Sequence, residues 1–158
     1  MPVRIIGIDP GSNVTGWGII DRDGSRLIHV AHGQIRASGR KPIEDRLVEI
    51  YDALEAVLRE HVPVHAGVEL PFVSENPQTA IVLGHARGAA VLALARAGVM
   101  LASYPPATVK QAITGSGKAE KAQVQLMVKT LLNLRERPPA DAADALAVAI
   151  CHAFRLRQ

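Results

Sequence analysis

A segment near the start of the chain, residues 3–11, reads VRIIGIDPG. Its first part is mostly apolar and β-branched, and Asp9-Pro10-Gly11 then gives a turn signal. This pattern predicts a buried β-strand that ends on an acid. A carboxylate beside an apolar core is costly unless something compensates its charge, so Asp9 needs a partner.

A second apolar segment, residues 64–68, has the same form. It ends on Glu69, and Pro71 follows soon after. The carboxyl ends of neighbouring parallel strands lie at the same edge of a sheet. Asp9 and Glu69 therefore converge on one point if these two strands are parallel neighbours.

The remaining segments predict an α/β fold. An antiparallel meander is expected to continue from the first strand through residues 14–20 and 26–35, and a further strand is predicted at 99–104. Helices are predicted at 43–58, at 79–97, after Pro105-Pro106, at 119–132 and at 140–153. The helix at 79–97 is rich in Ala and Gly, which favours either tight packing on its own sheet or a subunit interface. Residues 36–41 form an exposed basic loop.

The length of 158 residues fits a single domain, residues 1–158, with a core of small aliphatic side chains. The net charge is only +3, but the charges are unevenly placed. Up to Ala86 the acids outnumber Lys plus Arg by 11 to 8, whereas from Arg87 onward the basic residues lead by 10 to 4. The second half is suited to a polyanionic partner, although a chance surplus gives the same count.

Cys151 is the only cysteine, so a reducing compartment is expected. It lies in an apolar helical run, which favours a small buried hydrophobe over a nucleophile. The first residues lack the pattern of a secretion signal, and no apolar run is expected to span a membrane. We therefore expect a cytoplasmic protein with no membrane contact.

Two further acids, Asp141 and Asp144, lie on one face at the start of the last predicted helix. One interpretation is structural: Asp141 caps the helix after two prolines, and Asp144 complements the helix dipole in the first turn. The other is functional, because the surrounding segment is Ala and Leu and offers no basic residue to pair with Asp144.

Together the four acids favour a metal site. Carboxylates that converge repel one another, and divalent cations remove that repulsion. Carboxylate oxygens suit Mg²⁺ or Mn²⁺, whereas zinc prefers His and Cys. Two such ions about 4 Å apart promote phosphodiester hydrolysis. Histidines do not fit this site, because His152 lies too far along the helix and His85 has no companion at ligand spacing.

Four ordered motifs resemble the RuvC family of Holliday-junction resolvases. They are IGIDPG with TGWG (6–11 and 15–18), ELPF with LGHARG (69–72 and 83–88), GSGKAEKAQV (115–124) and DAADALA (141–147). The resemblance implies a ribonuclease-H-like fold with a five-stranded mixed sheet flanked by helices. It also implies a Mg²⁺-dependent endodeoxyribonuclease that acts in recombination and repair. As a homodimer it would nick a four-way DNA junction symmetrically and cooperate with the RuvA–RuvB branch-migration complex.

The resemblance further implies roles for single residues. The catalytic, metal-binding acids would hold two Mg²⁺ ions, for which Mn²⁺ substitutes; they are Asp9, Glu69, Asp141 and Asp144. Lys110 and Lys121 would contact DNA phosphates, and Phe72 would stack on an unpaired base at the junction centre. Leu70 departs from the pattern, since many members have Gln there, which puts any contact of that side chain in doubt.

Several of these residues also have a structural interpretation. Lys118 and Lys121, at the start of a predicted helix, are contacts to a DNA backbone or a solvated helix face. Their loop lacks the spacing of a Walker motif, so it does not indicate nucleotide binding. Phe72 either stacks on a base or anchors its loop in the core. Trp17 is expected to pack in the sheet or the core.

Three other functions compete. Actin-like ATPases and sugar kinases open with a similar strand and glycine turn, but they need two such domains and a longer chain. A related nuclease that acts on structured RNA is not excluded by the residues. A junction-binding protein without cleavage predicts that at least one of the four acids is replaced, and here all four are present.

Overall fold

The computed structural model describes residues 1–71 and 75–157. Within them, five strands form one sheet in the order β3-β2-β1-β4-β5. An antiparallel meander comprises β1 (Val3–Asp9), β2 (Val14–Asp23) and β3 (Arg26–Arg36). On the other side of β1, β4 (His65–Glu69) and β5 (Met100–Tyr104) run parallel to it. The predicted five-stranded mixed sheet is therefore confirmed.

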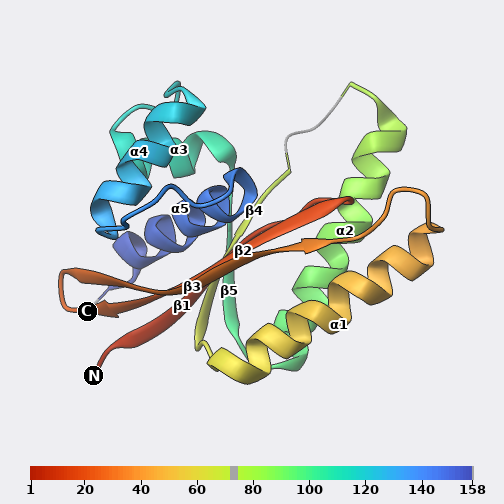
Figure 1. Ribbon diagram of the computed structural model, residues 1–158, viewed down its shortest axis with the longest axis horizontal. Coiled ribbons are helices and arrows are strands. Elements are labelled where there is room, and N and C mark those ends of the chain that lie inside the picture. Colours follow the sequence, from red (N-terminus) through yellow and green to blue (C-terminus); the bar gives the residue numbers. More distant parts are fainter. Residues whose placement is uncertain (72–74, 158) are drawn as a thin grey trace.

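Helices cover both faces of the sheet (Figure 1). One face carries α1 (Ile43–His61) and α2 (Pro77–Arg96). The other carries α5 (Ala140–Arg155), with α3 (Pro106–Thr114) and α4 (Lys121–Leu131) packed against it. Alternate residues of β1 supply the two cores: Ile5 faces α5, whereas Ile6 and Ile8 face α1 and α2.

Glycines in the strands let α5 lie unusually close to the sheet. A Cβ atom on Gly7 would lie 1.9 Å from the carbonyl oxygen of Ala145, and one on Gly16 would lie 1.9 Å from that of Asp141. No side chain fits at either position, because the backbone of α5 lies directly against the strand there. The start of α5 is thereby held over the end of the sheet where β1 finishes.

Two residues predicted to pack do so. Trp17 contacts the core on the α1 side, with its ring centroid 5.9 Å from that of His61. Cys151 is fully buried in α5. The register between β2 and β3 shifts between Ile19 and Ile20, which marks a β-bulge or irregularity in the meander.

α2 differs from the expectation that no segment is long and apolar enough to span a membrane. It is the single helix in residues 1–71 and 75–157 whose length and apolar composition would suffice. Core helices of soluble proteins meet the same criterion. Here α2 packs beside α1 and buries one stripe of its surface, formed by Ala86, Ala90, Ala93 and Leu94.

Candidate active site

Asp9 and Glu69 lie side by side at the ends of two parallel strands. Ile8 pairs with Val68 across β1 and β4, and each acid is the next residue of its strand. The pKa of Asp9 is raised to about 9, first by burial, then by the charge of Glu69 and a hydrogen bond with it, and also by the charges of Asp144 and Asp141. All four acids therefore act on one point.

Glu69 has a mixed environment. Burial raises its pKa, whereas the hydrogen bond with Asp9 and the positive charges of Lys110 and Lys121 oppose that rise. Asp9 in its protonated form donates to the Glu69 carboxylate, because this hydrogen bond raises the pKa of Asp9 and lowers that of Glu69. Without a metal, the pair thus shares a proton at neutral pH.

Asp141 does not cap its helix. The N-cap of α5 is Pro139, which makes no side-chain cap, and Asp141 lies inside the first turn. Gln34 of β3 instead donates from Nε2 to Oδ2 of Asp141 at 3.2 Å. The capping interpretation is wrong, because the carboxylate faces the sheet and not the free backbone N–H groups of the helix.

Asp144 has a basic partner, contrary to expectation. The ammonium of Lys121 lies 3.2 Å from Oδ2 of Asp144, and Lys121 is the first residue of α4. Burial raises the pKa of Asp144, and Lys121 opposes the rise. The partner was missed because it comes from another helix, whereas the segment around Asp144 contains only small apolar residues.

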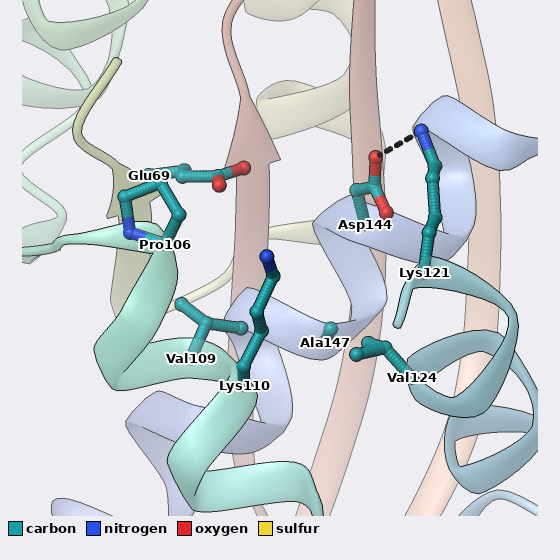
Figure 2. A pocket seen from close by; sticks show the side chains of 8 residues that line it. All are labelled: Glu69, Pro106, Val109, Lys110, Lys121, Val124, Asp144 and Ala147. Carbon is teal, nitrogen blue, oxygen red and sulfur yellow. Dashed lines mark ion pairs between the residues drawn. The ribbon is translucent and has the colours of Figure 1, made fainter. Parts of the chain in front are cut away.

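Two of the acids, Glu69 and Asp144, line a pocket of about 190 Å³ together with Lys110 and Lys121 (Figure 2). Glu69 and Asp144 project from opposite sides of it, and the side chain of Lys110 reaches into the space between them. The strand β4 and the helices α3, α4 and α5 supply its lining residues, which are Glu69, Pro106, Val109, Lys110, Lys121, Val124, Asp144 and Ala147.

Other predicted residues lie elsewhere. Lys118 is exposed in the loop before α4 and does not line the pocket, because the helix begins at Lys121 rather than at residue 119. Phe72 lies outside the described residues. His85 is exposed on α2, and His152 is buried and hydrogen-bonded to Tyr104. Gln34 was missed, since one Gln in an alternating strand gives no signal.

The donor set suits a hard divalent cation, because it consists of carboxylate oxygens whose mutual repulsion a cation would relieve. No three His, Cys, Asp or Glu side chains in the described part of the chain are arranged as a ready-made metal site. Two acids have other partners, since Lys121 pairs with Asp144 and Gln34 with Asp141. A metal ion at Asp144 would therefore have to displace Lys121, whereas the bond from Gln34 would orient Asp141 as a ligand.

Comparison with known proteins identifies the family. Residues 5–152 match the family described as crossover junction endodeoxyribonuclease RuvC. The chain belongs to the RuvC family. RuvC of Magnetococcus marinus is 50% identical over 151 residues, covering 96% of this chain and 84% of that protein. RuvC of Geobacter sulfurreducens is likewise 50% identical, covering 96% of this chain and 92% of that one.

Solved structures of the RuvC family agree with this fold. The structure of Thermus thermophilus RuvC matches with a TM-score of 0.86 at 35% identity, over 96% of this chain and 94% of that one. The same protein in complex with a Holliday junction substrate gives 0.87 at 33% identity and the same coverage. The predicted ribonuclease-H-like fold is confirmed.

Proposed function

We propose that this chain resolves four-way DNA junctions by metal-dependent hydrolysis of phosphodiester bonds, placing symmetric nicks across the junction. The observation that carries the proposal is the mutual influence of four acids from β1, β4 and α5, two of which, Glu69 and Asp144, line one pocket with two lysines. Membership of the RuvC family supports the reaction class, that of a crossover junction endodeoxyribonuclease. A T. thermophilus relative has been solved in complex with a Holliday junction substrate.

The four acids, Asp9, Glu69, Asp141 and Asp144, are proposed to hold two Mg²⁺ ions, with Mn²⁺ as a substitute. When bound, the ions would activate water and stabilise the leaving oxygen. Asp9 must lose the proton that it shares with Glu69, and Asp144 must leave Lys121. Both changes are favoured by a divalent charge at the centre of the cluster, which offsets the repulsion that now raises the pKa of Asp9.

The lysines are proposed to receive the DNA backbone. Lys110 and Lys121 line the same pocket as Glu69 and Asp144, so a phosphate held by them lies next to the acids. The side chain of Lys121 is 61% exposed, which leaves it free to turn toward DNA once Asp144 has a metal partner. Lys118 is proposed as a peripheral contact from its exposed loop. The proposed stacking of Phe72 on an unpaired base rests on the family resemblance.

A homodimer is proposed, because symmetric nicking needs two active sites. One surface suits it: the side chains of Val48 on α1 and of Ile81 and Leu92 on α2 are 58%, 59% and 54% exposed. An apolar hollow of about 310 Å³ lies between the two helices beside Val48 and Leu92. The small residues of α2 allow a second copy to approach closely.

The cellular setting follows from the family. We propose that residues 1–158 act as one nuclease domain in the cytoplasm, that the protein works with the RuvA–RuvB complex, and that no membrane is involved. The substrate is a DNA junction whose crossover point is moved by branch migration, which is the reason for proposing the RuvA–RuvB complex as a partner.

The decisive experiment compares three labelled substrates, a four-way junction, a plain duplex and a structured RNA, each with Mg²⁺, with Mn²⁺ and with chelator. Paired cuts at symmetric positions of the junction, absent with chelator, are the expected result. Cutting of RNA in preference to the junction would replace the proposed substrate. Cleavage that persists with chelator would overturn the role of the four acids.

A further inference from the structure

A buried hydrogen bond joins the far end of α5 to the end of β5. The hydroxyl of Tyr104 lies 2.7 Å from Nδ1 of His152. Both residues are buried, with exposures of 8% and 6%. His152 is on the helix that carries Asp141 and Asp144, and Tyr104 is the last residue of β5. The bond therefore links α5, which carries Asp141 and Asp144, to β5, the strand next to the one that ends at Glu69.

The backbone of Tyr104 is tied to Glu69. The two residues are register partners across β4 and β5, and the carbonyl of Tyr104 accepts a hydrogen bond from the backbone N–H of Leu70 at 2.8 Å. The position of Tyr104 thus sets the position of the strand end that presents Glu69.

The start of α3 depends on the same residue. Pro105 is the N-cap of α3, and Pro106 is both its first residue and a lining residue of the active-site pocket. The helix then presents Lys110 to that pocket. Since both prolines follow Tyr104 directly, fixing Tyr104 also fixes where α3 begins relative to α5.

Stability alone is a poor reason for this polar pair. Nε2 of His152 is buried and makes no hydrogen bond to any described residue. The His65 ring lies 5.5 Å from the His152 ring between centroids. Burial lowers the pKa of His152 to about 4, so the ring is neutral. An apolar pair would fill the space without an unsatisfied buried nitrogen, which is costly. Compared with an apolar pair, the polar pair adds a hydrogen bond that fixes the relative orientation of Tyr104 and His152.

We propose that Tyr104 and His152 are positioning residues that lock β4, β5 and α3 to α5, so that Glu69 and Lys110 are held opposite Asp144. Neither residue contacts the pocket through its own side chain. The proposal rests on the proposed function, in which the acids of these elements bind metal together. It predicts that breaking the bond weakens metal binding and turnover far more than junction binding, to which Lys110 supplies only one of the proposed contacts.

The test uses Tyr104→Phe, with Tyr51→Phe as the matched control, because Tyr51 is the only other tyrosine and lies on α1. Mn²⁺ binding is measured by electron paramagnetic resonance, junction affinity in chelator by filter binding, and kcat on saturating junction. Tyr104→Phe is expected to raise the Kd for Mn²⁺ by about tenfold, as loss of outer supporting bonds does, and to lower kcat. Tyr51→Phe is expected to change neither.

A double variant separates positioning from packing. Tyr104→Phe/His152→Leu removes both polar groups and refills the space, so its Tm should recover by about 3–6 °C over that of Tyr104→Phe. Its Kd for Mn²⁺ should stay raised. His152→Asn keeps an amide nitrogen at the place of Nδ1 and should retain metal binding close to that of the unmodified protein.

Two outcomes would overturn the inference. Mn²⁺ binding of the double variant at the level of the unmodified protein would reduce the pair to packing. An equal loss of metal binding in Tyr51→Phe would make the effect non-specific. If the unmodified protein binds no Mn²⁺, the proposed function itself fails and the inference falls with it, which is a different result from either.

Discussion

The ammonium nitrogen of Lys121 lies 3.2 Å from Oδ2 of Asp144, so the chain supplies its own cation to one of the four acids. The two side chains differ in exposure, at 61% for the lysine and 24% for the aspartate. The lysine is therefore the more exposed partner and the carboxylate the more buried one. In the proposed function the ion pair would compete with a metal for Asp144 and would be released when a metal binds.

Removing this lysine should separate its two roles. Lys121→Ala is expected to weaken binding to DNA of any sequence and to reduce the slope of log affinity against log salt by about one, because one phosphate contact is lost. Metal affinity in the absence of DNA should rise, since Asp144 loses its competitor. Filter binding over a salt series and Mn²⁺ titration measure the two effects. An unchanged salt slope would contradict the phosphate contact, and Lys129→Ala, at the other end of α4, serves as the control.

Asp9 is expected to be essential for cleavage and dispensable for binding. Asp9→Asn removes charge from the metal site but no phosphate contact, so junction affinity should be nearly unchanged while nicking is abolished. Gel assays on a labelled junction measure both. Nicking by the purified variant would refute the role of Asp9, and Asp52→Asn, on the exposed side of α1, is the control for the loss of an acid.

The metal-free protein should lose stability as the pH rises. Asp9 has an ordinary pKa of 3.8, which is raised to about 9 in the folded protein. Between these values the folded state binds more protons than the unfolded state, so the free energy of unfolding falls with pH. At about pH 8 in chelator, Asp9→Asn should be the more stable protein by on the order of 1–3 kcal/mol, and the gap should vanish near pH 4. Denaturant unfolding at several pH values tests this, and a gap that does not change with pH would contradict it.

The close contact between α5 and the sheet should not tolerate a methyl group. Gly16→Ala places a Cβ 1.9 Å from the carbonyl oxygen of Asp141, so the start of α5 must move. Overpacking of this kind costs about 1–3 kcal/mol, and junction cleavage should fall with it because Asp141 is displaced. Thermal unfolding and kcat are the measurements. Gly84→Ala, whose Cβ meets nothing within 4 Å, should leave both unimpaired.

A charge on the proposed dimer surface should produce monomers. Leu92→Asp buries an unpaired carboxylate if a second copy covers α2, which is strongly unfavourable. Sedimentation velocity should then show a monomer that still folds. Leu126→Asp, at a comparably exposed leucine on α4, is the control and should remain dimeric. A Leu92→Asp protein that sediments as a dimer would place the interface elsewhere.

The sequence allows the local parts of this structure to be predicted well. Apolar runs that stop at Asp9 and Glu69 mark two strands and the acids at their ends, and proline pairs mark where α3 and α5 start. These features depend on neighbours in sequence. The parallel pairing of β1 with β4 brings Asp9 and Glu69 together. The two apolar segments are compatible with this pairing, but they do not determine which strands are neighbours.

Contacts between distant segments could not be predicted in this way. Lys121 reaches Asp144 from another helix, and Gln34 reaches Asp141 from the edge strand β3. Helix capping by Asp141 is a reasonable alternative because caps are local, yet α5 begins at Ala140 with Pro139 as its N-cap. The bond between Tyr104 and His152 joins residues that no motif links.

The glycines under α5 have a consequence for protein design. Side chains in contact can change rotamers to absorb a substitution, whereas a backbone resting on a backbone has no such freedom. The spacing between the strand acids and the helix acids is therefore built into the scaffold. A design that transfers this site to another protein would have to transfer the sheet and α5 together. Grafting the four acids alone would not reproduce the distance between the strand acids and the helix acids.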